Sequence, residues 1–93
     1  MSEVRAVDVV SRIRSDLENM MGDRMRLKAN LGRSRIVERV GTLEEIHPSL
    51  FVVSVEEKRN RKARVSYSYA DVLTGTVQLI HPETEENLLP WLN

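Results

Sequence analysis

Apolar residues in the first part of the chain recur at the spacing of a helix. Those that share one face are three or four positions apart: Val7, Val10, Ile13, Leu17 and Met20. Ser2 can cap the first turn, and Gly22 follows the last apolar position, where many helices end in a left-handed residue. The pattern predicts a helix over residues 3–21 that covers an open end of a hydrophobic core.

From residue 24 onward, the pattern changes to the alternation that is typical of strands. Alternating or continuous apolar runs predict five strands, over residues 24–30, 35–46, 50–57, 63–69 and 75–80. Gly41 interrupts the second strand, which indicates a bulge or a sharp bend. The third strand reads LFVVSVEE and is apolar at consecutive positions, so we expect it to be the most buried strand.

One helix followed by five short strands predicts a mainly β fold, with an N-terminal helix and a five-stranded SH3-like or Sm-like small barrel. Closing the sheet removes its exposed edges, and side chains fill a barrel this narrow. The predicted domain covers residues 1–82, and residues 83–93 form a C-terminal tail. The tail has apolar side chains that must be buried against the helix, a second copy of the chain or another protein: Leu88, Leu89, Trp91 and Leu92.

The last two predicted strands are joined by the stretch RVSYSYADVLTG. Tyr67 and Tyr69 alternate with serines and share a face with Val65, so we expect both rings inside the barrel rather than exposed for base stacking. The link is short enough to require one tight helical turn. We expect Asp71 to accept a backbone N–H at the start of this turn, and Gly75 to adopt the dihedral angles needed to leave it. These residues predict a structural corner.

The fourteen basic and fourteen acidic residues cancel, so affinity for a polyanion must come from a local patch. One candidate patch follows the first strand and continues across the next turn: Arg24, Arg26, Lys28, Arg33, Arg35 and Arg39. Such a surface can contact a protein or, in an Sm-like nucleic-acid module, the phosphates of RNA or DNA. It can also be a solvated strand face that prevents aggregation. A second basic group is expected in a solvated loop: Lys58, Arg59, Arg61, Lys62 and Arg64.

The sequence indicates no enzyme chemistry. It contains no cysteine, which excludes disulfides and thiolate sites and fits a cytoplasmic location. His47 and His81 each precede a proline and are far apart in the sequence, so we expect strand ends there, and neither a metal nor a cofactor. The sequence pattern indicates neither a secretory signal nor a membrane span. We therefore expect a cytoplasmic, non-enzymatic protein that is not inserted in a membrane.

Two longer segments combine several of these features: GDRMRLKANLGRSRIVERVGTLEEIHPSLFVV and RVSYSYADVLTGTVQL. They contain an LKAN strand, a GR turn, an ER.G.L strand, a P..F.V strand and an SYSYADVLT segment. Over roughly residues 22–80, this combination resembles the Veg family of small proteins from Gram-positive bacteria. The resemblance implies a non-enzymatic intracellular regulator that stimulates biofilm formation by relieving a transcriptional repressor of matrix genes. Its expected partner is a transcriptional regulator, with nucleic acid and a second copy of the chain as alternatives.

Overall fold

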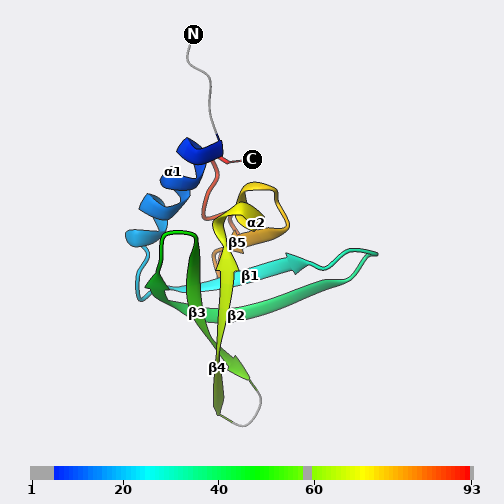
Figure 1. The fold of residues 1–93 in the computed structure, drawn as a ribbon. Coiled ribbons are helices and arrows are strands. Elements are labelled where there is room, and N and C mark those ends of the chain that lie inside the picture. The colour runs from blue at the N-terminus through cyan, green and yellow to red at the C-terminus, as the bar shows by residue number, and fades with distance from the viewer. Residues whose placement is uncertain (1–5, 58–59, 93) are drawn as a thin grey trace.

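The computed structural model of the chain describes residues 6–57 and 60–92. Its elements are, in chain order, α1 Ala6–Glu18, β1 Arg24–Asn30, β2 Ile36–Ile46, β3 Leu50–Glu57, β4 Arg61–Ser68, α2 Tyr69–Leu73 and β5 Val77–Ile80. Figure 1 shows α1 at one end of the strands and the β1–β2 hairpin projecting from the body. The predicted fold class is confirmed, because one N-terminal helix precedes five strands in a mainly β fold.

Helix α1 covers the core with the face that the apolar spacing predicts, and Ile13 and Leu17 are fully buried. The helix ends earlier than predicted, because the chain tightens into turns after Glu18. Gly22 then has a φ of 84°, the left-handed conformation expected of it. The expected cap, Ser2, lies outside the described residues.

The five strands form one antiparallel sheet in the order β4-β3-β2-β1-β5. β2 is long enough to pair with two neighbours, β1 over residues 36–42 and β3 over residues 41–46. β4 and β5 are the outer strands, and no ladder joins them in the described part of the chain. The sheet is compatible with a small barrel, but backbone hydrogen bonds do not close it. Helix α2 instead occupies the connection between its two edges.

Gly41 lies where β2 passes from β1 to β3 and is paired with both strands. A Cβ atom at this position would lie 2.5 Å from the Ser54 carbonyl oxygen and 2.6 Å from Val53 Cγ1. Glycine therefore allows the two backbones to approach this closely. The expected bend corresponds to this crossing point, whereas the register shift of a bulge lies further along, between Leu43 and Glu45.

The hydrophobic core lies between α1, α2 and the inner face of the sheet. Its buried residues are Ile13, Leu17, Met25, Leu27, Leu43, Phe51, Val53, Val55, Tyr69, Val72, Val77, Leu79 and Leu89. β3 contributes more of them than any other strand, as its continuous apolar run predicts. β4 contributes none: Val65 and Tyr67, although expected inside, are only half-buried. The reason is that β4 is an edge strand, so a neighbouring strand covers its side chains on one side only.

The corner between β4 and β5 is a helical turn, but its cap is not the predicted one. The N–H group of Asp71 donates a hydrogen bond of 3.1 Å to Ser68 Oγ, so Ser68 is the capping residue. The prediction for Asp71 was wrong because the helix begins at Tyr69, so Asp71 is its third residue rather than its cap. Gly75 follows the turn with a φ of 81°.

Tyr69 is the first residue of α2 rather than the last of β4. Its hydroxyl donates a hydrogen bond of 2.8 Å to the His47 carbonyl oxygen. The rings of Tyr67 and Tyr69 each stack on Phe51, with ring centroids 5.7 Å apart. Burial raises the pKa of both tyrosines above the ordinary value, and Arg39 opposes that shift at Tyr67. Because Tyr69 is buried, its ring is closed to base stacking.

The C-terminal tail packs against the body of the protein. The Leu88 N–H donates to the Leu79 carbonyl oxygen at 2.9 Å, and Leu89 is only 2% exposed. The Trp91 indole N–H donates to Asp16 Oδ2 of α1 at 2.6 Å. The Arg12 guanidinium lies 4.0 Å from the centroid of the Trp91 ring. Leu89 is buried in the core, and the other apolar tail residues, Leu88, Trp91 and Leu92, are half-buried against it. The contact of Trp91 with α1 corresponds to the first of the expected alternatives.

Replacing Gly41 with alanine is expected to lower the free energy of unfolding by about 3 kcal/mol, because the new Cβ meets β3 backbone. The measurement is urea unfolding followed by circular dichroism. Gly32→Ala is the matched control, since that site has a φ of 86° but no atom within 4 Å. It should cost only about 1 kcal/mol. Equal losses for both variants would contradict the close-contact argument.

Leu89→Ala is expected to lower the free energy of unfolding by about 3 kcal/mol, because it leaves a cavity in the core. Leu92→Ala is the control, since Leu92 is only half-buried and should cost about 1 kcal/mol. Both are measured by the same urea titration. A loss below about 1 kcal/mol for Leu89→Ala would show that the tail is not part of the folded core.

Candidate interaction surface

Three of the predicted cations share the outer face of β1. In the β1–β2 ladder, Arg24 is opposite Thr42, Arg26 is opposite Val40, and Lys28 is opposite Glu38. The residues between them, such as Leu27, point into the core. The alternation of apolar and basic residues along the strand therefore predicts correctly that these three cations share the outer face.

Two of these three cations already have acidic or carbonyl partners. Arg26 lies 3.1 Å from Glu85 Oε1 and also donates to the Pro82 carbonyl oxygen at 3.3 Å. Lys28 Nζ lies 4.0 Å from Glu38 Oε1. Such exposed pairs contribute little to stability, typically about 0–1 kcal/mol. They do change the surface, because the face carries mixed charge rather than a continuous positive stripe.

Arg39 does not extend this face, contrary to the prediction. It is opposite Leu27 in the ladder, so it shares the face of the sheet from which Leu27 enters the core. There it lies beside Tyr67 of β4 and lowers the pKa of that hydroxyl against the effect of burial. The register pairs even-numbered residues of β1 with even-numbered residues of β2, and Arg39 is odd-numbered. Two successive side chains of a strand face opposite ways.

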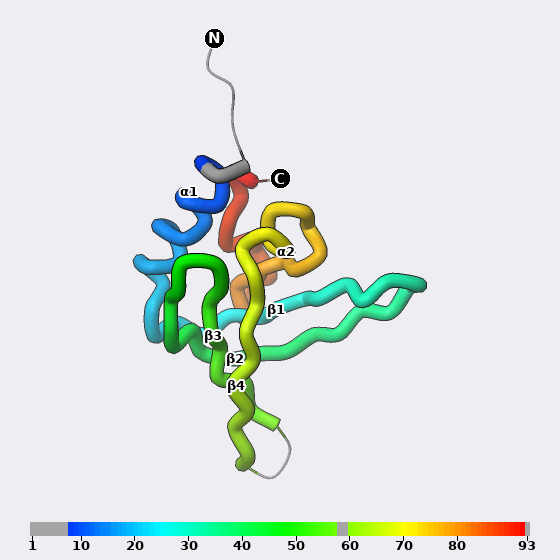
Figure 2. The backbone as a smooth tube through the Cα atoms, viewed as in Figure 1, coloured from blue at the N-terminus to red at the C-terminus, as the bar shows by residue number. Residues whose placement is uncertain are grey.

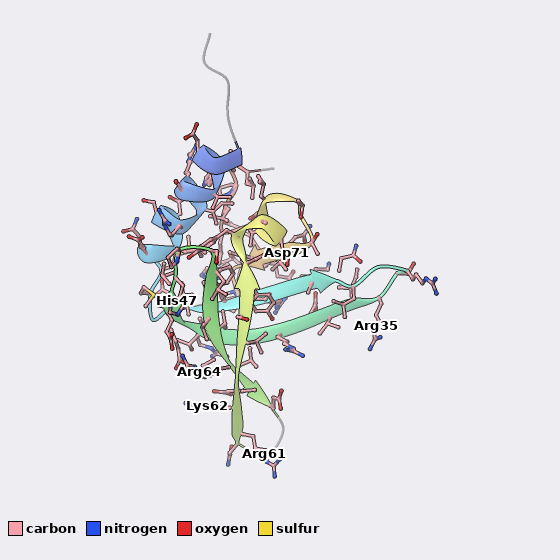
Figure 3. The ribbon with its side chains drawn as sticks, in the orientation of Figure 1. Arg35, His47, Arg61, Lys62, Arg64 and Asp71 are labelled. Atoms are coloured by element: carbon pink, nitrogen blue, oxygen red, sulfur yellow. The ribbon has the colours of Figure 1, made fainter. Side chains whose placement is uncertain are left out.

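Arg33 and Arg35 lie at the end of the projecting β1–β2 hairpin, which we call the arm. Residues 31–36 form the arm tip. Figure 2 follows the arm away from the rest of the chain, and Figure 3 shows Arg35 at its end. Leu31 and Ile36 in the same tip are 59% and 51% exposed. The strand pattern does not mark these two apolar residues as a surface feature, and the only signal in the sequence is the position of Leu31 between Asn30 and Gly32.

The arm tip has an unusual backbone. Gly32, Arg33 and Ser34 have φ angles of 86°, 51° and 63°, all in the left-handed region. The Arg35 N–H donates to the Gly32 carbonyl oxygen at 2.9 Å. Hairpin turns with two positive φ angles favour asparagine and glycine, because a Cβ atom is crowded there. Arginine and serine at these positions therefore cost stability.

The second basic group faces carboxylates on the neighbouring strands. Arg61 and Lys62 are opposite Glu57 and Glu56 in the β3–β4 ladder. Arg64 forms ion pairs with Glu45 and, at 3.7 Å, with Glu44. Figure 3 shows the three basic residues along β4. The other two members of the group, Lys58 and Arg59, lie outside the described residues.

Both histidines have local structural partners just beyond a strand end. His47 Nε2 lies 2.8 Å from Glu45 Oε1. The ring nitrogen Nδ1 of His81 accepts hydrogen bonds from the N–H groups of Glu83 and Thr84, at 3.1 and 3.2 Å. Within residues 6–57 and 60–92, no group of three or more histidine, aspartate and glutamate side chains is placed to hold a metal ion. Of the helices in the described chain, none has the length and apolar character to cross a membrane.

A surface groove with a volume of about 810 Å³ lies between β1, the chain before it and the tail. Arg24 and Arg26 line it together with Asp23, His81 and Glu83. Its cations thus stand among acidic neighbours, and His81 is engaged in the turn that follows β5. The groove shares the mixed charge of the outer β1 face.

The family model for the biofilm formation stimulator Veg matches residues 8–80. The chain belongs to this family. The match extends from α1 to the end of β5 and includes the whole arm, whereas the tail lies beyond it. A comparison with curated proteins finds no match. Veg family membership gives the general role, stimulation of biofilm formation, and the surfaces described above are candidates for performing it.

Ser34→Gly is expected to raise the free energy of unfolding by about 0.5–1 kcal/mol, because glycine adopts a positive φ without the crowding of a Cβ atom. Ser66→Gly is the control. Ser66 is an exposed serine in β4, where glycine should lower stability by a similar amount. Urea unfolding measures both variants. A decrease for Ser34→Gly would contradict the left-handed conformation of the arm tip.

Proposed function

We propose that this Veg family chain is a non-enzymatic regulator that acts inside the cell by binding another protein. The proposed partner is a transcriptional regulator that represses matrix genes, and binding relieves the repression. Family membership supports the general role in biofilm formation. The identity of the partner class and the absence of catalysis are part of the proposal.

The observation that carries the proposal is the mixed charge of the cationic strand faces. Arg26 and Lys28 are paired with Glu85 and Glu38, and Arg64 is paired with two glutamates. A protein that follows a nucleic-acid backbone needs unpaired cations, because its affinity comes from neutralising phosphates. Cations and carboxylates in alternation instead suit a protein surface, where complementary charges set the orientation of the partner.

The half-buried position of Tyr67 and the full burial of Tyr69 support the same conclusion. Proteins that bind single-stranded nucleic acids present exposed aromatic rings on which bases stack. The rings of this chain stack on Phe51 instead. The Sm-like nucleic-acid module is therefore the weaker interpretation, and it predicts a different dependence on salt.

Titration of the chain with single-stranded RNA and with duplex DNA is expected to give no saturable binding at about 0.15 M salt. The reason is that two of the three cations on the outer face of β1, Arg26 and Lys28, are already paired with carboxylates. Fluorescence anisotropy at about 0.05 M and 0.15 M salt measures this. Tight binding at the lower salt that weakens at least tenfold at the higher salt would favour the nucleic-acid module instead.

The test for the protein partner uses the immobilised full chain and a nuclease-treated lysate of biofilm-forming cells. A transcriptional regulator should be retained, and the purified regulator should leave its matrix-gene operator DNA when the chain is added. An electrophoretic mobility shift measures this release. A regulator that stays on its operator at saturating chain concentration would contradict the proposed mechanism.

A further inference from the structure

We infer that the arm tip inserts into an apolar cleft rimmed by carboxylates on the protein partner. The inference rests on the proposed function for the existence of that partner, and it adds the site and the chemistry of contact. Four side chains are proposed to make the contact: Leu31, Arg33, Arg35 and Ile36.

The apolar part of the contact consists of Leu31 and Ile36. They are 59% and 51% exposed, and the other large apolar residue of comparable exposure in the described chain is Met21, at 45%. Ile36 is paired with Asn30, the residue immediately before Leu31, so both apolar side chains lie at the same end of the hairpin. Scattered single apolar residues are normal on surfaces, but two together at the end of a projecting arm indicate a contact site.

The charges of the arm tip are all positive. No acidic residue occurs in the sequence between Asp23 and Glu38. Arg33 and Arg35 therefore stand beside the two apolar side chains without a neighbouring carboxylate in that segment. A complementary surface must supply apolar area at its centre and carboxylates around it. Arginine is well suited to such a rim, because its guanidinium can make two parallel hydrogen bonds to one carboxylate.

The arm tip is held in one shape by short-range hydrogen bonds. The Gly32 N–H donates to Asn30 Oδ1 at 2.8 Å, and the Leu31 N–H donates to the Arg35 carbonyl oxygen at 2.8 Å. The second of these bonds spans the turn. A preformed loop loses little conformational entropy on binding. This favours a shaped protein cleft over an anionic lipid surface, which does not require a fixed loop geometry.

The left-handed conformation of Arg33 supports the inference independently of the exposure and charge of the arm tip. Glycine or asparagine would be more stable at a φ of 51°, yet the apex carries the long arginine side chain. Backbone conformations of this kind tend to occur at functional sites, where the side chain is needed at a defined position. Ser34, next to it, has the same conformation but a short side chain, and it provides a natural control.

The first experiment places a photo-crosslinking benzophenone residue at Leu31 or Ile36 of the full chain, with Met21 as the exposed apolar control on the body. The crosslinkers at Leu31 and Ile36 are expected to capture the same transcriptional regulator from cells, and the Met21 crosslinker is expected not to capture it. Mass spectrometry should map the crosslinks to a segment of the regulator that combines apolar residues with aspartate or glutamate. Crosslinks to a second copy of the chain, or to a basic segment of the regulator, would overturn the inference.

The second experiment measures affinity for the captured regulator by calorimetry. Leu31→Ser with Ile36→Ser, and separately Arg33→Glu with Arg35→Glu, should each weaken binding by about 30-fold or more. The controls should bind within about twofold of the native chain: Ser34→Gly for the backbone, and Arg61→Glu with Lys62→Glu for the change in charge. Unfolding midpoints close to the native value show that the variants are folded, as expected for exposed positions.

The outcomes separate the inference from the proposed function. Native-like affinity of the arm-tip variants overturns the inference and leaves the regulator as a partner bound elsewhere. Failure of the native chain to retain any regulator overturns the proposed function as well. A third experiment tests binding of the chain to vesicles with about 30% anionic lipid. Sedimentation of the native chain with them, lost in the Leu31→Ser, Ile36→Ser variant, would replace the protein cleft with a membrane surface.

Discussion

The arrangement of the sheet depends on the close approach of the β2 and β3 backbones at Gly41. At this point β2 is hydrogen-bonded on both sides, and a Cβ atom would lie 2.5 Å from the Ser54 carbonyl oxygen. Beyond Gly41, toward the start of β2, β3 no longer accompanies the strand, and β2 continues with β1 alone. The same contact that allows the sheet to curl around the core thus creates the free arm that carries Arg33 and Arg35.

The strands were predictable because the burial of alternate residues is recorded directly in the sequence. A strand with one face on the core alternates apolar and polar residues, and β3, whose first four residues are all apolar, contributes the most buried residues of any strand. The glycine at the crossing point was also recognisable, because few other functions require glycine within a strand. The cap at the corner was not, since Ser68 and Asp71 are both good acceptors, and a shift of three residues in the helix start decides between them.

The candidate surface was less predictable, since it depends on which residues of distant segments meet. The face of Arg39 follows from the register of the hairpin, and that register depends on the length and type of turn around Gly32. The pairing of Arg26 with Glu85 joins residues 59 positions apart and requires the tail to fold back along β5. The exposure of Leu31 and Ile36 follows from the projection of the arm, which no local pattern records.

The residues covered by the family match indicate which surface performs the role that the family shares. The matched region, residues 8–80, contains the whole arm but ends before Glu85. The ion pair that neutralises Arg26 is therefore supplied from outside the region that defines the family, whereas the exposed side chains of the arm tip lie inside it. A mode of binding shared by the family must use groups that lie within the matched region. The arm tip meets this condition with its own apolar and cationic side chains, and the outer face of β1 in this chain is modified by the tail.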